Sequence, residues 1–579
     1  MKYRPIFLTL FVVLFLCLVG VLVGAAPVRA STAIIVSTTI DELNDDGQCS
    51  LREAIRAANL DTASGATPGE CPAGSGADTI IVPSGIYTLT RLGTGEDAAL
   101  MGDLDITSTV TISGTSAAST IIDGGGIDRV LHVTGSTVTV SKVTVRGGTP
   151  PSAVSGINNG GGIRNEAVLI IDSTTISGNT TGSAGGGIYN SGTLTVTGST
   201  IFTNTAAWGG GGAINDGTLL FTNSTAMSNT TPDQGGAFWN NGALILLNSI
   251  VTGNNANLYG GGIKNASALT ATNSILSGNR ASIGGGLINF FGTATLLNSS
   301  VTTNTLGGGL YNQSGSLVVD GSIVSSNVGG GIGTFSGIVS LTNSTIKGNT
   351  GTYAGGISNS SGSTVIIDRS AIVSNTVTQD GGGIYNTGTM TITNSTISGN
   401  GADGTGGGIV ASFGTLTLNN VTIANNTADK NADSFGDGGG IRNNSSLAYM
   451  KNILVAGNVD TGGQAPDCSG TMTSLGHNLI QSTTGCTITL TTGDITNAAP
   501  LLGSLQANGG PTLTHALLSG SPAIDAGDSA TCATADQRGG VRPVDGNGDG
   551  NAICDIGAYE FGAMIPSAWL YLPLVTRGP

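Results

Sequence analysis

The chain has 579 residues, of which 96 are glycine and only 9% are charged, and its formal net charge is −15. A chain this long usually forms several packed domains, but this much glycine with so few charges is unusual in such domains and favours a repeated architecture. The negative charge repels nucleic acids and anionic membrane surfaces, so we predict neither as a partner.

The N-terminus has the organisation of a signal peptide. Lys2 and Arg4 precede an apolar run from Ile6 to about Gly24, and the sequence Val-Arg-Ala ending at Ala30 fits a cleavage site. An uncleaved membrane anchor is the alternative, because the apolar run is close to the length that spans a bilayer. We predict a signal peptide at residues 1–30 and a secreted or cell-surface mature chain with no membrane span. Its removal changes the charge from −15 to about −18.

The next predicted element is a helix at residues 49–59. Leu51, Ile55 and Ala58 fall on one of its faces. A stack of repeats exposes unpaired strand edges at both ends, so we expect this helix to cover the first repeat, which we place at residues 78–89.

Six cysteines remain after the signal peptide, in pairs that are adjacent in the sequence: Cys49 with Cys71, Cys468 with Cys486, and Cys532 with Cys554. Six cysteines allow 15 connectivities, but this clustering favours three local disulfides in an oxidising compartment. Each would close a loop of about 20 residues and contribute on the order of 3 kcal/mol. The chain has no Cys-x-x-Cys pair, and His132, His477 and His515 are widely separated, so we predict no zinc site.

From about residue 160 a Gly-Gly-Gly-apolar signature recurs, with a mean spacing of about 25 residues. Its apolar position holds Ile163, Ile188, Ala213, Phe238, Ile263, Leu287, Leu310, Ile332, Ile357, Ile384, Ile409 and Ile441. Gly, Thr, Ser and Asn dominate the repeats, which excludes helical repeats, and short alternating apolar segments indicate strands joined by tight turns. We predict an all-β, right-handed parallel β-helix of about 12–14 coils.

Asparagines recur at two fixed points of the repeat. The first series is Asn179, Asn204, Asn229, Asn254, Asn279, Asn304, Asn327, Asn349, Asn375, Asn400, Asn426 and Asn458. The second is Asn165, Asn190, Asn215, Asn240, Asn265, Asn289, Asn312, Asn359, Asn386 and Asn443. Asn tolerates the left-handed conformation of sharp turns, and its amide both donates and accepts, so we expect side-chain ladders from coil to coil.

Both ends of the chain resemble a known family. The sequence Cys-Ser-Leu-Arg-Glu-Ala at residues 49–54 resembles the CSLREA-type N-terminal domain of bacterial surface proteins. Residues 508–512, 521–527 and 555–561 resemble the anchor-associated C-terminal domain found with it, and the repeats resemble those of polymorphic outer-membrane proteins. The resemblance implies an exported β-helix surface protein of undefined activity. The membrane-anchoring end of that group is not evident, because residues 569–575 are too short to span a bilayer.

This organisation divides the chain into five parts: a signal peptide at 1–30, an N-terminal cap and first coil at 31–104, repeats at 105–460, a C-terminal capping or anchor-associated domain at 461–562, and a tail at 563–579.

Two groups of aspartates were considered as candidates for chemistry. Asp172, Asp320 and Asp368 fall where other coils carry Asn223, Asn248, Asn273 and Asn394, which indicates ladder substitutes. Asp380, Asp403 and Asp437 precede the glycine signature in three successive coils, where stacked turns would gather carboxylates for an ion or a pair of catalytic acids. The alternative interpretation of the second group is solvated turn residues.

The residue after the aligned apolar position gives a candidate ligand face. Arg164, Tyr189, Trp239, Lys264, Tyr311, Tyr385 and Arg442 occupy it, and strand alternation points them outward, where rings could stack on sugars or a protein partner. Ile214, Ile288, Gly333 and Ser358 interrupt this series, and ordinary exposed side chains are the alternative.

The sequence Asp-Gly-Asn-Gly-Asp-Gly at residues 545–550 fits the opening of a calcium loop, with Asp545, Asn547, Asp549 and Asp555 as candidate ligands. The twelfth position is Ile556 instead of Glu, so this is no EF-hand, and a plain glycine-rich turn is the alternative. His477 lies in a Gly-His-Asn sequence that we interpret as a structural turn.

Two functions follow from these observations. The first is a monomeric, non-catalytic surface rod that adheres or spaces and binds a polysaccharide or a cell-surface protein, with calcium as the only candidate cofactor. The second is a pectate-lyase-like polysaccharide lyase or hydrolase that uses the acidic edge at Asp380, Asp403 and Asp437.

Overall fold

The computed structural model describes residues 33–151 and 159–566. The predicted signal peptide with its cleavage site at Ala30 lies outside the described residues, and so does most of the predicted tail.

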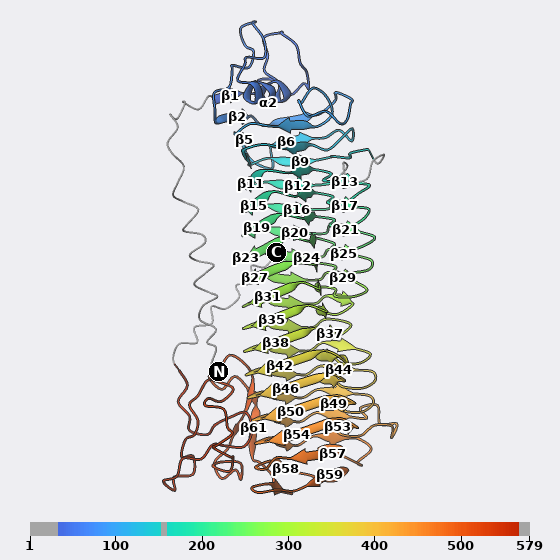
Figure 1. Ribbon diagram of the computed structural model, residues 1–579, viewed down its shortest axis with the longest axis vertical. Coiled ribbons are helices and arrows are strands. Elements are labelled where there is room, and N and C mark those ends of the chain that lie inside the picture. Colours follow the sequence, from blue (N-terminus) through green and yellow to red (C-terminus); the bar gives the residue numbers. More distant parts are fainter. Residues whose placement is uncertain (1–32, 152–158, 567–579) are drawn as a thin grey trace.

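The chain forms a parallel β-solenoid of about 15 turns, slightly more than predicted (Figure 1). Each full turn contributes one strand to each of three parallel ladders, sheets A, B and C, and many turns add a two-residue strand to a short fourth ladder. Residues in equivalent positions of successive coils therefore stand directly above one another.

Sheet C consists of β4 (Leu104–Ile106), β7 (Leu131–Val133), β10 (Ile163–Asn165), β14 (Ile188–Asn190), β18 (Ala213–Asn215), β22 (Phe238–Asn240), β26 (Ile263–Asn265), β30 (Leu287–Phe290), β34 (Leu310–Gln313), β37 (Ile332–Phe335), β41 (Ile357–Asn359), β45 (Ile384–Asn386), β49 (Ile409–Ser412), β53 (Ile441–Asn444) and the start of β57 (Cys468–Ser474).

Sheet A consists of β1 (Ala33–Ile35), β2 (Asp78–Val82), β5 (Val110–Gly114), β8 (Thr137–Ser141), β11 (Val168–Asp172), β15 (Thr193–Thr197), β19 (Thr218–Thr222), β23 (Ala243–Leu247), β27 (Ala268–Thr272), β31 (Thr293–Leu297), β35 (Ser316–Asp320), β38 (Ile338–Thr342), β42 (Thr364–Asp368), β46 (Thr389–Thr393), β50 (Thr415–Asn419), β54 (Leu447–Lys451), the rest of β57, and β59 (Cys486–Thr489).

Sheet B consists of β3 (Gly85–Thr88), β6 (Thr120–Asp123), β9 (Thr144–Arg146), β12 (Thr175–Ser177), β16 (Thr200–Phe202), β20 (Thr225–Met227), β24 (Ile250–Thr252), β28 (Ile275–Ser277), β32 (Ser300–Thr302), β36 (Ile323–Ser325), β39 (Thr345–Lys347), β43 (Ala371–Val373), β47 (Thr396–Ser398), β51 (Thr422–Ala424), β55 (Leu454–Ala456), β58 (Leu479–Ile480) and β60 (Ile495–Thr496).

The short fourth ladder has two separate runs. The first is β13 (Thr180–Thr181), β17 (Thr205–Ala206), β21 (Thr230–Thr231), β25 (Asn255–Ala256), β29 (Arg280–Ala281) and β33 (Thr305–Leu306). The second is β40 (Thr350–Gly351), β44 (Thr376–Val377), β48 (Gly401–Ala402), β52 (Thr427–Ala428) and β56 (Val459–Asp460).

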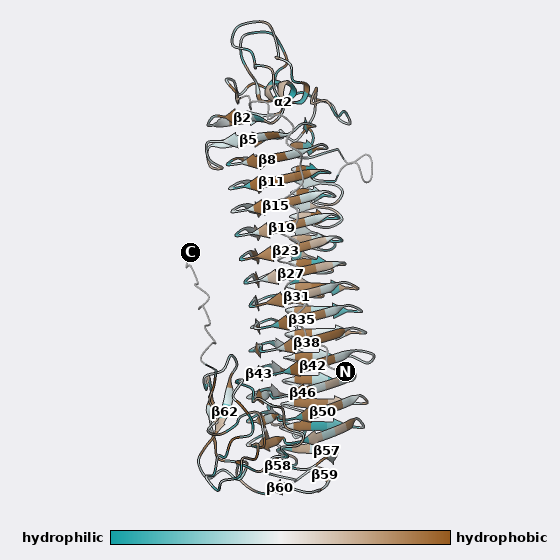
Figure 2. Cartoon of the chain, turned by 60° about the vertical axis from the view of Figure 1, so that its left-hand side comes forward, coloured by the Kyte–Doolittle hydropathy of each residue, from teal (hydrophilic) through white to brown (hydrophobic). Residues whose placement is uncertain are grey.

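The core is a continuous apolar column inside the solenoid, visible as the hydrophobic bands of the strands in Figure 2. In one coil Leu194, Val196 and Ile201 point inward and are completely buried. Three or four such side chains at about 2 kcal/mol each cannot offset the ordering of 25 residues at about 1–2 kcal/mol each, so a coil is stable only between neighbours.

Both predicted asparagine ladders are present and buried. In the first series Asn179 Nδ2 donates to Asn204 Oδ1 at 2.9 Å, and in the second Asn165 Nδ2 donates to Asn190 Oδ1 at 2.7 Å. Neither series takes positive φ, although left-handed tolerance was part of our reason for expecting them. That conformation belongs to a third, mostly exposed series that includes Asn223, Asn248 and Asn273. The buried ladders depend on the amide group itself, which satisfies backbone groups inside the turn.

The assignment of Asp172, Asp320 and Asp368 as substitutes for the third series is wrong by one residue. Asp172 stands in register with Thr197, and Asp320 with Leu297, at the last position of each sheet A strand. The left-handed residue follows them, as Ser173 and Arg369 do in two of these coils.

The N-terminal cap contains the predicted helix, which is α2 (Leu51–Leu60). It begins later than predicted because Ser50 is its N-cap: the Ser50 hydroxyl accepts from Glu53 N, and the Glu53 carboxylate accepts from Ser50 N. The preceding strand β1 pairs with β2, so one rung lies before the predicted first coil. The disulfide Cys49–Cys71 closes the loop that follows α2.

The C-terminal region leaves the solenoid and folds back along its side (Figure 1). Residues 461–496 extend the ladders through β60, and residues after 497, with the antiparallel hairpin β61 (Leu502–Gln506) and β62 (Thr514–Leu517), pack beside sheet B. Gln537 accepts a 2.6 Å hydrogen bond from Thr396, and His515 lies 2.9 Å from the Ser398 hydroxyl. The disulfides Cys468–Cys486 and Cys532–Cys554 complete the predicted set of three, which is confirmed.

Candidate functional site

The candidate ligand face is one continuous column of residues on the outer side of sheet C, which we call the sheet C column. Strand pairing places each member directly above the next. In chain order it holds Asp105, His132, Arg164, Tyr189, Ile214, Trp239, Lys264, Ile288, Tyr311, Gly333, Ser358, Tyr385, Val410, Arg442 and Ser469. The predicted ligand face starts only at Arg164, because no glycine signature precedes Asp105 or His132.

Side chains in the column contact one another, and their burial varies: Asp105 and Ile288 are completely buried, whereas the tyrosines and Trp239 are partly exposed. The Lys264 ammonium lies 4.6 Å from the Trp239 ring centroid, and the Arg164 guanidinium lies 5.5 Å from that of Tyr189. Burial lowers the pKa of Lys264 and raises that of Tyr189. The indole N–H of Trp239 is buried and has no hydrogen-bond partner among the described residues. The face is therefore a packed strip of rings and cations.

The column opens into a notch where two coils are shorter than the rest. The spacing of the buried asparagines falls from 25 residues at Asn204 and Asn229 to 23 at Asn304 and Asn327, and to 22 in the next coil. The fourth ladder is interrupted there, between β33 and β40. The missing residues leave a depression of about 270 Å³ in the wall of the solenoid.

Two tyrosines line this notch. They are Tyr311 and Tyr353, and Tyr353 also contacts Tyr385 edge-on at 6.1 Å between ring centroids. Gly333 follows Tyr311 in register, and a Cβ atom there would lie 2.8 Å from Cδ2 of the Tyr311 ring. The glycine therefore leaves room for the Tyr311 ring to lie against the backbone of β37, and the tyrosine is partly exposed. The described residues that line the notch carry no charge.

The acidic edge does not form a compact centre. Asp380 accepts hydrogen bonds from the Thr405 backbone N–H and hydroxyl, while Asp437 forms a 2.6 Å ion pair with Arg442 and accepts from Ser469. Within the described ranges, the one group of three potential metal ligands within 4.8 Å of one another is elsewhere, so Asp380, Asp403 and Asp437 do not converge to that distance. Asp380 therefore joins its turn to the next coil, and Asp437 is already paired with Arg442.

The candidate calcium loop keeps Asp545, Asn547 and Asp549 together and directs Asp555 elsewhere. The Asp545 carboxylate accepts from the N–H groups of Gly548, Asp549 and Gly550, so the loop folds around it, and Asn547 and Asp549 are exposed beside it. Asp555 points into the protein and accepts from Asp525 N and Phe561 N. It is fully buried, which together with nearby Glu560 raises its pKa to about 7.

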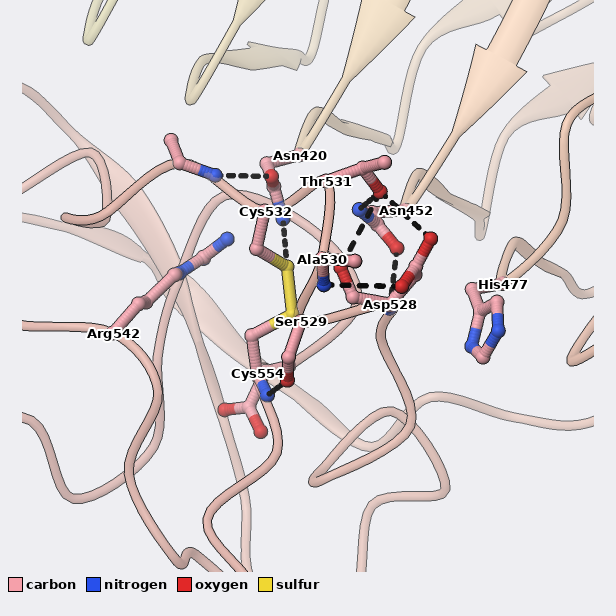
Figure 3. The surroundings of a disulfide bond; sticks show 12 residues. Asn420, Asn452, His477, Asp528, Ser529, Ala530, Thr531, Cys532, Arg542 and Cys554 are labelled. Atoms are coloured by element: carbon pink, nitrogen blue, oxygen red, sulfur yellow. Dashed lines mark hydrogen bonds between the residues drawn. A yellow bond between two sulfur atoms is a disulfide. The ribbon is translucent and has the colours of Figure 1, made fainter.

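The disulfide Cys532–Cys554 joins two segments of the C-terminal region and lies beside Asn420 and Asn452 of the solenoid, as Figure 3 shows. Asn452 Oδ1 accepts from Asp528 N at 2.8 Å, and Asp528 forms a 2.9 Å ion pair with Lys451 that lowers its pKa to about 2. His477 takes the left-handed conformation with φ of 56°, and its Nδ1 lies 2.9 Å from the Ala526 carbonyl oxygen. This contact agrees with the structural interpretation of His477.

The residues that sequence reasoning missed stand at the start of the column. Asp105 and His132 are in register, and Asp97 from the preceding loop reaches the same point. The sequence did contain a signal for them. Asp105 and His132 each lie between two apolar residues, and each is the middle residue of its strand, as Tyr189 is.

Comparisons with known proteins do not assign the chain to a family. No family model and no curated protein matches the chain. Among solved structures it is similar to the A-module of the mannuronan C-5 epimerase AlgE4 of Azotobacter vinelandii, with 13% identity, 66% of this chain and 90% of that chain covered, and a TM-score of 0.29. It is also similar to pectate lyase Pel9A, with 12% identity, 92% and 97% covered, and a TM-score of 0.21. Likenesses of this degree carry no information on activity.

None of the helices in the described part of the chain is long and apolar enough to cross a membrane.

Proposed function

We propose that this protein is an exported, non-catalytic rod that binds a neutral glycan along the sheet C column, with the notch at Tyr311 as its main contact. The observation that carries this proposal is the partly exposed Tyr311 ring, which lies against Gly333 and lines an uncharged depression. The apolar face of a pyranose ring packs on such an aromatic surface, and backbone groups in the glycine-rich wall supply hydrogen bonds to its hydroxyls.

Charge favours a neutral ligand over an acidic one. The formal net charge of −15 repels polyuronates, and no cation lines the described part of the notch. Three disulfides support an oxidising, extracytoplasmic location, as does the resemblance of residues 49–54 to CSLREA-type surface proteins.

The alternative function, cleavage of a polysaccharide at the acidic edge, has weaker support. A pair of catalytic carboxylates requires two acids at a defined separation on one bond of the substrate, and a lyase requires a basic residue beside them. Asp437 is already paired with Arg442, and Asp380 holds the turn at Thr405.

The test measures binding of the purified protein to a panel of neutral glycans by affinity electrophoresis and calorimetry. Tyr311→Ala should weaken binding at least about 10-fold, or about 1.4 kcal/mol. Gly333→Val is the sharper variant: φ at Gly333 is not positive and a β-branched residue suits strand β37, but its side chain displaces the Tyr311 ring. It should abolish binding without lowering Tm.

The matched control is Tyr449→Ala, which removes an outward-facing tyrosine from sheet A, away from the column. An equal loss of affinity in this control, or normal affinity in Gly333→Val, would contradict the proposal. Incubation with uronic-acid polymers, with and without calcium, tests the alternative. Release of unsaturated or reducing ends that Asp403→Ala abolishes would replace our proposal with an enzymatic function.

A further inference from the structure

The N-terminal end of the sheet C column holds three potential metal ligands. Asp97 Oδ1, Asp105 Oδ1 and His132 Nδ1 lie within 4.8 Å of one another. His132 Nδ1 is 3.1 Å from Asp105 Oδ1 and 3.5 Å from Asp97 Oδ1. Two ligands at 2.0–2.2 Å from one ion are about 3.0–3.5 Å apart, so both contacts already have the separation that a shared first-row ion imposes.

Hydrogen bonds alone do not satisfy all the polar atoms of this cluster. An imidazole Nδ1 carries at most one proton, and here two carboxylate oxygens approach the same nitrogen. The two carboxylates are also near each other, which costs free energy unless a cation lies between them. The neighbouring arginines are engaged elsewhere, Arg129 with Asp103 and Arg164 with Glu166.

Groups around the three potential ligands hold Asp105 and His132 in place, as the residues behind the ligands of a metal site do. The second oxygen of Asp105 accepts from Ala99 N at 2.9 Å, and the Asp105 side chain is completely buried. On the other side of the imidazole, Glu166 Oε1 lies 3.9 Å from His132 Nε2, which is buried and makes no hydrogen bond within the described residues. A nearby carboxylate favours a proton on Nε2, which leaves Nδ1 available to an ion.

The cap positions the third ligand. Asp97 lies in a loop that Arg56 holds through the Ala98 carbonyl at 2.6 Å and that Arg52 holds through the Gly102 carbonyl at 2.8 Å. The Asp97 side chain itself is 78% exposed, so the open side of the cluster faces solvent. An ion could therefore enter from solvent without opening the fold.

We propose that Asp97, Asp105 and His132 bind one divalent first-row transition-metal ion of the zinc class. Imidazole with two carboxylates suits such an ion better than calcium or magnesium, which prefer oxygen ligands alone. Three protein ligands leave at least one position for water or a ligand oxygen, at the head of the column. The scatter of the histidines predicted no zinc site, but one histidine suffices when strand register brings Asp105 to it and the cap loop brings Asp97.

The test uses the full mature protein, stripped of metal by chelation and titrated with Zn²⁺ alone by calorimetry, with Co²⁺ absorption as a second readout. Wild type should bind one Zn²⁺ at a site that His132→Ala weakens at least 30-fold, roughly the effect of losing one ligand. Asp97→Asn should weaken it at least 10-fold and change the Co²⁺ spectrum. Glu166→Gln should weaken it about 10-fold with the spectrum retained.

Two controls separate this site from other Zn²⁺ binding. His477→Ala removes a partly exposed histidine far along the chain, and Asp549→Asn alters the candidate calcium loop. Both should bind Zn²⁺ as wild type does. If His132→Ala does not fold, the Zn²⁺ affinity of Asp97→Asn tests the proposal instead, because the exposed Asp97 side chain contributes little to the core. Unchanged Zn²⁺ affinity in Asp97→Asn, or Ca²⁺ binding of equal strength that His132→Ala leaves intact, would overturn the proposal.

Discussion

The Arg52 guanidinium and the Asp41 carboxylate form a two-pronged ion pair enclosed between the cap and the first coils. Nε donates to Oδ1 at 2.6 Å and Nη2 to Oδ2 at 3.2 Å, and the side chains are 0% and 3% exposed. Arg52 also donates to the carbonyls of Gly102 and Asp103. One arginine of the Cys-Ser-Leu-Arg-Glu-Ala motif therefore joins three segments of the cap.

Arg52→Ala should detach the cap. It leaves Asp41 as an uncompensated buried charge and removes the donors of two carbonyl groups, a loss of about 3–5 kcal/mol. We expect faster proteolysis within residues 33–103 and a lower urea midpoint. Arg56→Ala is the control, because its bond to Ala98 is exposed and should contribute less than about 1 kcal/mol. Equal protease resistance of wild type and Arg52→Ala would show that the cap does not depend on this residue.

Asn254→Ala should break a buried ladder in the middle of the rod. Asn254 Nδ2 donates to Ala226 O and Asn279 Oδ1, and its Oδ1 accepts from the backbone and side chain of Asn229. Truncation leaves several buried groups without partners, so we expect a loss of about 3–5 kcal/mol in the free energy of unfolding, measured with urea. Asn241→Ala removes one exposed hydrogen bond to Asp216 and should change it by less than about 0.5 kcal/mol. Similar losses in both variants would mean that the ladder adds nothing specific.

The buried carboxyl of Asp555 predicts a pH dependence of stability. Its folded-state pKa is raised to about 7, whereas an unfolded aspartate has a pKa of about 3.9, so the folded protein binds an extra proton between these values. Stability from this group is therefore complete below about pH 4 and declines as pH rises to 7, by at most about 1.4 kcal/mol per pH unit.

The measurement is the unfolding free energy of wild type minus that of Asp555→Asn at several pH values from 4.5 to 7.5, which covers most of the interval between the two pKa values. Burial lowers the pKa of His515, which acts in the opposite direction, but His515 is present in both proteins and cancels in the difference. A difference that stays constant across this range would contradict the assignment.

Calcium binding at residues 545–550 stays a prediction, now without Asp555 as a ligand because that carboxyl serves two backbone groups inside the protein. We expect Ca²⁺ at about 100 times its Kd to stabilise the C-terminal region by about 2.7 kcal/mol and to raise its Tm. Asp549→Asn should remove this rise, and Asp433→Asn, in another exposed loop, should retain it. A Tm that neither Ca²⁺ nor chelation changes would leave a plain glycine-rich turn.

Sequence periodicity was enough to predict the solenoid, both buried asparagine ladders and the three disulfides. Each of these features repeats at a fixed spacing or is local in the chain, so a residue's position in the coil determines its neighbours. Residue type predicted less accurately than position in the coil. Asp172 lies one residue away from the position that its type suggests, and the left-handed conformation occurs at other asparagines than those of the two buried series.

Tertiary structure alone decided the two candidate sites. The notch at Tyr311 exists because two coils lost residues, and only stacking shows that a short coil between full ones exposes a ring. The cluster at His132 joins Asp97, Asp105 and His132 through strand register and a loop that the cap holds in place. A repeated sequence determines which residues stack, because equal spacing repeats equal contacts. The irregular coils and the chain ends break that equality, so their contacts arise only from the folded geometry.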